Sequence, residues 1–361
     1  MKNFLLGLVS ILVAFLVLAV GGEIVTRLVY LMPEPVAPDR VIGVMTLDPE
    51  LGWVATANYL FDGQLVDAGG NAYPANIRSN SAGYRMYGNP QEEGRKKVLF
   101  LGDSFTQAMH VSNENTYYGI LGRDLDLEVF AFGTEAYGTL QEYMLLDRII
   151  DGIKPDVVVL QFCPNDFINN HYALELESVS NNNGLRRPYF QDGNIVYRTP
   201  SRVAALREFA ASYSHFLYWI LTRIDMVKAA PANASPDDSS EQLIVKEGLS
   251  YPYFQESVQI TQQLLKKFRD RVPATTPVYI FSSHNAEPYH AQLQRALEGS
   301  GMIFIDGTGQ AVIDAQKQGI TAVAGDHSHW NNAGHQIVAD VLKRYFIENG
   351  QFTRAADSPA P

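Results

Sequence analysis

The sequence contains very little cysteine and comparatively little positive charge. Cys163 is the one cysteine among 361 residues, so no disulfide can form within the chain. The lack of a disulfide does not indicate whether the compartment is oxidising or reducing, because proteins without disulfides also occur in oxidising compartments. The 28 Lys and Arg residues are outnumbered by 39 Asp and Glu residues, which gives a net charge of -11. Since binding to a phosphate backbone needs a clustered excess of Lys and Arg, we expect no nucleic-acid partner.

The remaining composition is ordinary for a globular protein, with 46% hydrophobic and 19% charged residues. A chain of this length can bury one substantial core with insertions, or two small domains.

One long stretch without charge stands near the N-terminus, from residue 4 to residue 22. It covers about 19 residues, enough to cross the hydrocarbon core of a bilayer as a helix. Residues 23–31 continue with helical amphipathic spacing. We therefore predict a membrane anchor over residues 1–32, with a cleaved signal peptide or a buried core helix as the alternatives. Lys2 favours a cytoplasmic N-terminus. The expected location is the inner (cytoplasmic) membrane, single-pass, with the remaining chain facing the periplasm or the extracellular side.

From Lys96 onward, apolar runs alternate with segments of helical periodicity. A continuous apolar run, typical of a strand buried on both faces, occurs at residues 98–101, and further strands are expected at residues 129–132, 157–162, 278–282 and 302–305. Helical spacing occurs at residues 117–125, 139–150, 257–270 and 333–347. This alternation predicts a three-layer α/β/α domain with a central parallel sheet over residues 96–350. Functional groups should then collect at the carboxyl ends of the strands.

Three other segments do not follow this alternation. Residues 33–95 begin with a proline-rich linker and continue as short strands and turns that wrap on the main domain. An insertion occupies about residues 171–251. It either lines the active site or is a peripheral decoration, and the sequence leaves both possibilities open. Residues 351–361 are expected to form a disordered tail.

Within the insertion we expect three features. A small hairpin lies around residues 187–194, where Asp192-Gly193 provides a turn. An aromatic-rich helix covers residues 201–227. Residues 229–242 are rich in proline, serine and acidic residues, and are expected to be a disordered loop.

The tripeptide Gly102-Asp103-Ser104 directly follows the first buried strand. A serine at a strand-to-helix turn exposes its hydroxyl, and the N-terminus of the following helix favours developing negative charge. Gly102 allows the backbone to turn tightly. Taken alone, such a tripeptide is more often a turn with a capping serine.

Asp326 and His329 lie on a loop just before the last helix. A histidine can accept a serine proton when a carboxylate fixes its tautomer, and this pair is close enough in sequence to provide both groups. His327 and His335 are competing histidines. The alternative is a metal site formed by Asp326, His327, His329 and His335.

Two further turns follow predicted strands. Asn165 could direct a side-chain N–H at an oxyanion, although an Asn-Asp turn is the more common fate of such a dipeptide. The turn over residues 133–139 exposes backbone N–H groups, including those of Ala136 and Gly138. Cys163 is an alternative nucleophile, but a small buried residue at a strand end is the better interpretation.

Taken together and in this order, these blocks resemble the SGNH (GDSL-type) hydrolase family over about residues 96–347, apart from the insertion. Gly102-Asp103-Ser104 matches the nucleophile block, Asn165-Asp166 the block with the oxyanion asparagine, and Asp326-x-x-His329 the block with carboxylate and base. The segment from Ile77 to Arg85 is similar to a lead-in of membrane-anchored bacterial members.

The resemblance implies an SGNH/flavodoxin-like fold with Ser104, Asp326 and His329 as the catalytic triad. It also implies an oxyanion hole formed by the Ser104 N–H, the Asn165 side chain and the N–H of Ala136 or Gly138. Two positions depart from the family pattern, because Cys163 and Ala136 stand where glycine is usual. An alanine N–H donates equally well if its backbone dihedral φ is not positive.

The implied activity is a serine hydrolase that cleaves acyl or acetyl esters on a carbohydrate or a lipid through an acyl-enzyme, without a cofactor. One alternative is an O-acyltransferase that acts on cell-surface polysaccharide with the same triad. A second alternative is a catalytically silent carbohydrate-binding protein of the same fold.

Overall fold

A computed structural model describes residues 2–29, 41–202, 206, 210, 213–228 and 239–353. The predicted linker, parts of the predicted helix over residues 201–227, most of the predicted loop over 229–242 and most of the predicted tail lie outside these residues.

The centre of the fold is a six-stranded sheet with the strand order β13-β12-β9-β7-β8-β6. Its strands are β6 (Met86–Tyr87), β7 (Lys97–Gly102), β8 (Glu128–Gly133), β9 (Val157–Phe162), β12 (Val278–Ser282) and β13 (Ile303–Phe304). Neighbouring strands pair in parallel, except that β6 pairs antiparallel with β8 at the edge. The predicted α/β fold with a central, mostly parallel sheet is therefore confirmed. The antiparallel edge strand was not predicted, because two residues are too few for a periodic signal.

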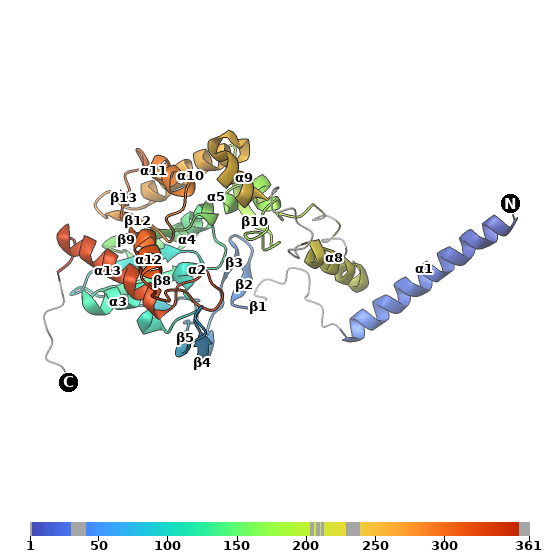
Figure 1. Ribbon diagram of the computed structural model, residues 1–361, viewed down its shortest axis with the longest axis horizontal. Helices are drawn as coiled ribbons and strands as arrows, with labels where there is room; N and C mark the ends of the chain where they lie inside the picture. The colour runs from blue at the N-terminus through green and yellow to red at the C-terminus, as the bar shows by residue number, and fades with distance from the viewer. Residues whose placement is uncertain are drawn as a thin grey trace.

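Helices cover both faces of this sheet (Figure 1). Side chains at alternate positions of one strand point to opposite faces, so Leu99 joins one buried cluster and Phe100 the other. The first face packs against α4 (Thr139–Ile153), α10 (Pro252–Arg271) and α11 (Tyr289–Leu297). The second face packs against α3 (Tyr117–Asp124), α12 (Thr308–Lys317) and α13 (Asn332–Glu348). The helices α11 and α12 are additions to the sequence prediction.

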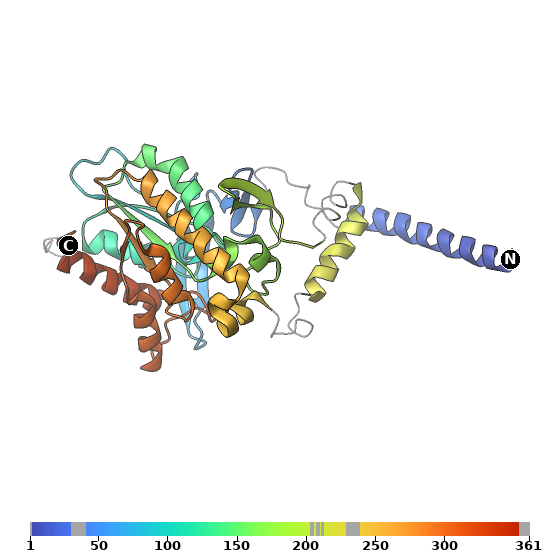
Figure 2. The same cartoon turned by 90° about the horizontal axis from the view of Figure 1, so that it is seen from above.

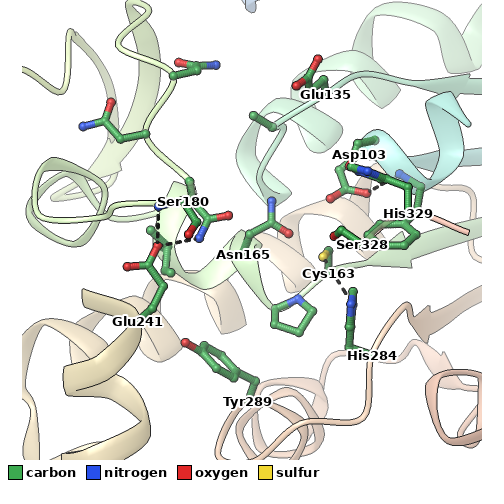
Figure 3. A pocket seen from close by; sticks show the side chains of 18 of the residues that line it. Asp103, Glu135, Cys163, Asn165, Ser180, Glu241, His284, Tyr289, Ser328 and His329 are labelled. Atoms are coloured by element: carbon green, nitrogen blue, oxygen red, sulfur yellow. Dashed lines mark hydrogen bonds between the residues drawn. The ribbon is translucent and has the colours of Figure 1, made fainter. Parts of the chain in front are cut away.

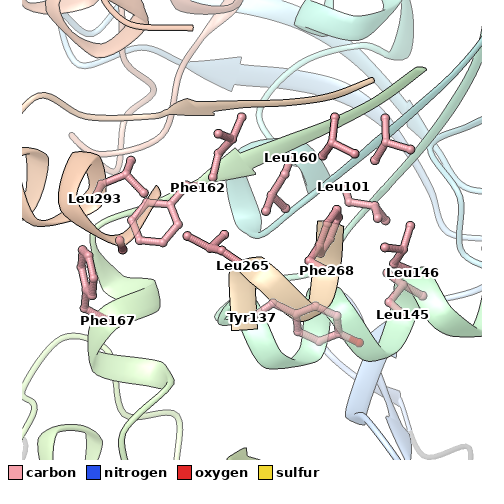
Figure 4. Packing of buried hydrophobic residues seen from close by; sticks show 14 of the residues in the cluster. Leu101, Tyr137, Leu145, Leu146, Leu160, Phe162, Phe167, Leu265, Phe268 and Leu293 are labelled. Carbon is pink, nitrogen blue, oxygen red and sulfur yellow. The ribbon is translucent and has the colours of Figure 1, made fainter. Parts of the chain in front are cut away.

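The packing on the first face explains the stability of the layer (Figure 4). Leu101 and Leu160 of the sheet share a buried cluster with Leu265 and Phe268 of α10, and all four are fully buried. Burying each such side chain contributes on the order of 1.5–3 kcal/mol before chain entropy is counted.

The segment before the sheet forms two small antiparallel units. They comprise β1 (Val41–Ile42), β2 (Met45–Asp48) and β3 (Gly52–Ala55), then the hairpin of β4 (Leu60–Val66) and β5 (Ala72–Arg78). Trp53 is fully buried, and its Nε1–H donates to the carbonyl of Glu135, 2.8 Å away. The hairpin reaches the loop before α13, where the Gly325 N–H donates to the Val66 carbonyl at 2.8 Å. This segment therefore supports loops at the carboxyl edge of the sheet.

A group of short elements follows β9. They are α5 (Asn165–Asn169), α6 (Tyr172–Leu176), β10 (Arg187–Gln191), β11 (Asn194–Arg198), α8 (His215–Lys228) and α9 (Ser240–Glu247), followed by the 3-10 turn η3 (Gly248–Ser250). A fully buried ion pair of 3.0 Å joins Arg187 of the hairpin to Glu175 of α6. The Tyr189 hydroxyl also donates to Glu175, at 2.9 Å. The expected hairpin is present, and these contacts fix it to the body of the protein.

The expectation of a disordered loop as far as Gln242 is wrong at its C-terminal end. The α9 helix begins at Ser240, and the Ser239 side chain caps it by accepting a hydrogen bond from the Gln242 N–H. Because a capped N-terminus satisfies otherwise unpaired amides, a helix can form here despite the polar composition.

The N-terminal helix α1 (Lys2–Val29) projects away from the body, and α8 lies beside its inner end (Figures 1 and 2). Within α1, Val9–Leu28 is long and apolar enough to cross a membrane, with a mean hydropathy of 2.3. Glu23 accepts hydrogen bonds from the Ser214 hydroxyl and the His215 and Phe216 N–H groups, at 2.9 to 3.0 Å. These contacts join the start of α8 to the apolar helix.

Candidate active site

Ser104 is the first residue of the short helix α2 (Ser104–Gln107), which begins directly after β7. A side chain on Gly102 would place its Cβ 2.4 Å from both Gln161 Oε1 and Thr106 Oγ1, so only glycine fits here. The buried Asp103 caps α2 by accepting a hydrogen bond from the Phe105 N–H at 3.0 Å. The sequence therefore produces the strand-turn-helix that presents Ser104, and the capping group is Asp103.

Ser104, His329 and Asp326 form a continuous hydrogen-bonded line. The Ser104 Oγ lies 2.8 Å from His329 Nε2, and His329 Nδ1 lies 2.5 Å from Asp326 Oδ2. The other carboxylate oxygen accepts from the N–H groups of Ser328 and His329, at 3.0 and 3.1 Å. Partial burial opposes ionisation of Asp326, but the hydrogen bond from His329 and that from the Ser328 N–H hold its pKa below the ordinary value.

The loop that carries Asp326 and His329 is held by main-chain hydrogen bonds. The Ala324 N–H donates to the His329 carbonyl at 2.8 Å, which closes the loop on itself. The buried Asn331 then caps α13 by accepting from the Gly334 N–H. The geometry at His329 is thus fixed from both sides of the loop.

His110 is a fourth member of this cluster that the sequence did not single out. Its Nε2 lies 3.2 Å from Asp326 Oδ2, the oxygen that His329 also contacts. Its ring stacks on that of His329, with centroids 5.1 Å apart and an angle of 18° between the planes. The sequence shows no signal for this role, because the turn after α2 is positioned by residues far away in the chain.

Arg85 is the main residue that positions the turn after α2. It is buried and is the last residue of the lead-in segment from Ile77 to Arg85. Its guanidinium donates to the carbonyls of Gln107 and Ala108 at 2.5 and 2.6 Å, and to that of Val111 at 2.9 Å. Carbonyls at the end of a helix need such donors, and an arginine can serve several at once. Arg85 therefore fixes the turn that carries His110.

The donor atoms of His110, Asp326 and His329 lie close enough together for a metal ion to be considered. The lone pairs of an imidazole lie in the plane of its ring, so two nearly parallel, stacked rings do not aim at one point. The alternative metal site from the sequence is not assembled either. His335 is buried and its Nδ1 accepts from the Tyr117 N–H, whereas His327 is exposed. The geometry of these residues therefore fits a hydrogen-bonded cluster better than a metal centre.

The triad opens into a cavity of about 440 Å³ (Figure 3). The residues of the insertion that line it are Ser180, Asn181, Asn182, Asn183 and Glu241. Of the two interpretations of the insertion, the structure thus supports the one in which it lines the cavity that contains Ser104.

Asn165, Ala136 and Gly138, which were predicted as possible oxyanion donors, differ in their position relative to the cavity. Ala136 and Asn165 line the cavity together with Ser104 and His329. Gly138 is buried, and a Cβ there would lie 2.9 Å from Asn170 Oδ1. Ala136 has a φ of 58°, a left-handed conformation that is uncommon for residues other than glycine. The predicted donor role of the Ala136 N–H assumed a φ that is not positive, and Ala136 does not meet this condition.

Asn165 is held by a series of side-chain contacts that runs into the insertion. Its Nδ2 donates to Asn169 Oδ1 at 3.0 Å, and Asn169 Nδ2 donates to the Asn181 carbonyl at 2.9 Å. Glu241 of α9 accepts from Asn181 Nδ2 at 2.9 Å and from the Ser180 N–H at 3.1 Å. Because Nδ2 carries two hydrogens, Asn165 retains one N–H after bonding to Asn169.

Cys163 is buried and its sulfur lies 3.9 Å from Nδ1 of His284, a histidine distant in sequence. Burial raises the pKa of the Cys163 thiol well above its ordinary value. Burial, together with the His329 charge, lowers the pKa of His284 to about 4. A neutral thiol beside a neutral imidazole is not an activated nucleophile, which favours the prediction that Cys163 is a buried packing residue.

Two fully buried carboxyl groups lie behind the Asn165 turn. Asp166 accepts from the Cys163 N–H at 3.3 Å and from the Thr139 hydroxyl at 2.9 Å. Glu142 of α4 is its neighbour, and burial together with the charge of Asp166 raises the pKa of Glu142 well above its ordinary value. Thr139 is the first residue of α4, and Gly138 is the N-cap.

Comparisons with known proteins give matches only among solved structures. No family model and no curated protein matches this sequence. A lipase/acylhydrolase from Enterococcus faecalis is similar at 13% identity and a TM-score of 0.39, covering 72% of this chain and 99% of its own. LAE5, an alpha/beta hydrolase enzyme from the metagenome of Lake Arreo, Spain, is similar at 15% identity and a TM-score of 0.38, covering 72% and 97%. Axe2, an acetylxylan esterase from Geobacillus stearothermophilus, is similar at 13% identity and a TM-score of 0.38, covering 69% and 93%. Likeness at this level carries no statement about the reaction of this chain.

Proposed function

We propose that this chain is a serine esterase of the SGNH type, with Ser104 as the nucleophile. The observation that carries the proposal is the line of hydrogen bonds from Ser104 Oγ through His329 to Asp326, at 2.8 and 2.5 Å. A nucleophile bonded to a base that is itself oriented by a carboxylate is the arrangement required for covalent acyl transfer.

The reaction begins when Ser104 Oγ attacks the ester carbonyl carbon and its proton passes to His329 Nε2. Asp326 stabilises the imidazolium that forms. His329 then returns the proton to the departing alkoxide, which leaves as an alcohol, and the acyl group remains on Ser104. A water molecule attacks this acyl-enzyme with the same base, and the carboxylic acid is released.

The carbonyl oxygen gains negative charge in both steps and needs hydrogen-bond donors. The proposed donors are the Ser104 N–H, the Ala136 N–H and the remaining N–H of Asn165. Their common position around the cavity supports Ala136 over the buried Gly138. Each donor is expected to lower the barrier by about 3 kcal/mol.

The proposed substrate is a short acyl ester on a carbohydrate. On the insertion side the cavity is lined by hydroxyl, amide and carboxylate groups, from Ser180 to Asn183 and from Glu241. Such groups hydrogen-bond to sugar hydroxyls, whereas a long acyl chain gains nothing from them. Phe105, Ile168 and Tyr289 line other parts of the cavity and suit a small apolar acyl group.

The decisive experiment uses the full chain in detergent with an aryl acetate as substrate. Ser104→Ala is expected to lower kcat by at least about 10⁴-fold, as removal of a triad nucleophile does elsewhere. Equal activity of wild type and Ser104→Ala would refute the assignment. A panel of acetylated glycans and longer acyl esters then tests the substrate class, and acetyl transfer to a glycan without hydrolysis would indicate the transferase alternative.

We also propose that α1 anchors the protein in the inner membrane with the catalytic domain outside the cytoplasm. The apolar stretch Val9–Leu28 supports this proposal, and a cleaved signal sequence is the alternative. A C-terminal alkaline phosphatase fusion should be active and should remain in the membrane fraction. An inactive fusion would contradict the orientation, and release into the soluble fraction would contradict the anchor.

A further inference from the structure

Two imidazoles lie close to one carboxylate oxygen in this centre. His329 Nδ1 lies 2.5 Å from Asp326 Oδ2, and His110 Nε2 approaches the same oxygen at 3.2 Å. The hydrogen bond to this oxygen is made by His329, whereas the ring of His110 stacks on the ring of His329. His110 has no place in the proton transfers described above, yet it contacts both Asp326 and His329.

The position of His110 is built by several distant parts of the chain. Arg85 binds the carbonyls on both sides of it, at Ala108 and Val111. The Tyr73 hydroxyl, from the β4–β5 hairpin, donates to the carbonyl of His110 itself at 2.9 Å. An arginine and a tyrosine that converge on one turn constrain where its imidazole can lie.

We propose that His110 is a positioning residue, which supports the face of the His329 ring and packs beside Asp326. This inference rests on the proposed esterase function. By supporting this ring, His110 keeps His329 Nε2 directed at Ser104 while the serine proton is transferred.

The charge of His110 then affects the reaction. The ionisable groups beside it are Asp326, His329 and Tyr73, and its charge also reaches the buried His335. Burial lowers the pKa of His110, and the charge of Asp326 opposes this shift only in part. A neutral His110 allows His329 to become an imidazolium in the transition state. A protonated His110 would place a second cation against the ring of His329 and oppose that step.

The test compares three substitutions in the full chain in detergent. His110→Ala removes the ring, His110→Phe keeps a ring for stacking that cannot ionise, and His110→Gln keeps a polar side chain without a ring. The control is His327→Asn. His327 is exposed on the loop that carries Asp326 and His329, and asparagine tolerates its φ of 60°. Thermal unfolding of each variant reports whether it is folded.

We expect His110→Ala to lower kcat on the order of 10- to 100-fold at nearly unchanged KM, because the base is misplaced and binding is not. His110→Phe should recover most of this loss, His110→Gln should not, and His327→Asn should equal wild type. In wild type the acid limb of log kcat/KM against pH should steepen as His110 gains its proton. In His110→Phe this additional steepening should be absent, because its side chain cannot ionise.

The rate at which a fluorophosphonate labels Ser104 separates this proposal from the proposed function. If wild type neither labels nor hydrolyses esters, the function is wrong. If wild type reacts and His110→Ala matches it, or if folded His110→Ala and His110→Phe are equally slow with the pH profile of wild type, the positioning role is wrong.

Discussion

The two walls of the cavity that contains Ser104 are held by different kinds of contact. The triad wall, formed by α2 and the loop over residues 323–331, is fixed mainly by backbone hydrogen bonds and helix caps. The insertion wall, formed by α5, residues 178–183 and Glu241, is fixed by a series of side-chain contacts that leads from Glu241 to Asn165.

This difference suggests a division of roles. Backbone contacts depend little on which side chains are present, so the triad wall can stay constant while the substrate changes. A wall held by side chains can be altered by single substitutions in the insertion. Changes on the triad wall should affect every ester alike, whereas changes on the insertion wall should depend on the substrate and on Asn165.

The largest effect on the insertion wall is expected from Asn165→Ala. Removal of one oxyanion donor should lower kcat on the order of 10²- to 10³-fold with little change in KM. Steady-state kinetics with an aryl acetate measures this, and Asn182→Ala on the same wall is the comparison. Loss of an oxyanion donor lowers kcat far more than twofold. A kcat of Asn165→Ala within about twofold of wild type would therefore show that Asn165 is not an oxyanion donor.

A smaller effect is expected from Glu241→Ala, which removes the acceptor that orders residues 178–181. Through Asn181 and Asn169 this should disorient Asn165 and lower kcat/KM about tenfold, a typical coupling within one hydrogen-bond network. Glu247→Ala, an exposed change near the end of the same helix, is the matched control.

A double-mutant cycle decides whether Glu241 acts through Asn165. If it does, Glu241→Ala should have almost no effect in a protein that already carries Asn165→Ala. Full additivity of the two losses would show that Glu241 acts on the substrate directly.

The sequence predicted the triad wall much better than the insertion wall. The run Val157–Leu160 is apolar throughout, which is typical of a buried parallel strand, and the parallel sheet brings the ends of such strands together. Ser104 on the triad wall could be located for this reason. Asn165, which lies just after β9, is the residue of the insertion wall that could be located in the same way. His110 could not, because its turn is placed by Arg85 and Tyr73 through contacts between distant parts of the chain.

On the insertion wall, composition was misleading. The polar stretch before Gln242 suggested disorder, yet Ser239 and Gln242 have the spacing of a capping box, a signal of a helix start that could have located Glu241. The conformation of Ala136 has no comparable signal, because nothing in an alanine indicates a positive φ.

The buried carboxyl groups behind the Asn165 turn predict a pH-dependent stability. Burial, with the charge of Asp166, raises the pKa of Glu142 in the folded state. Between the unfolded pKa and this higher folded pKa, unfolding releases a proton, so the free energy of unfolding falls as pH rises. Each such group contributes a slope of about 1.4 kcal/mol per pH unit in that window.

Glu142→Gln should remove the contribution of this group, because glutamine resembles the protonated acid. The advantage of the variant over wild type should grow as the pH rises above the unfolded pKa of about 4.3, measured by chemical unfolding. Glu135→Gln on the neighbouring turn is exposed and should show no such trend. An advantage that is constant with pH would mean that Glu142 is ionised in the folded protein.

The smallest effect is expected from Ala136→Gly, which keeps the backbone N–H that we propose as an oxyanion donor. Glycine adopts a φ of 58° without the steric cost that alanine meets, about 1 kcal/mol, but it also makes the unfolded chain more flexible by a similar amount. The free energy of unfolding should therefore change by less than about 1 kcal/mol, and kcat should remain near that of wild type. Gly138→Ala is the contrasting change, because its Cβ would lie 2.9 Å from Asn170 Oδ1 and 3.1 Å from Asn169 Cβ, the residue that holds Asn165. If Ala136→Gly were the more damaging of the two, the methyl group of Ala136 would be needed in the cavity, and its backbone N–H could not be its main contribution.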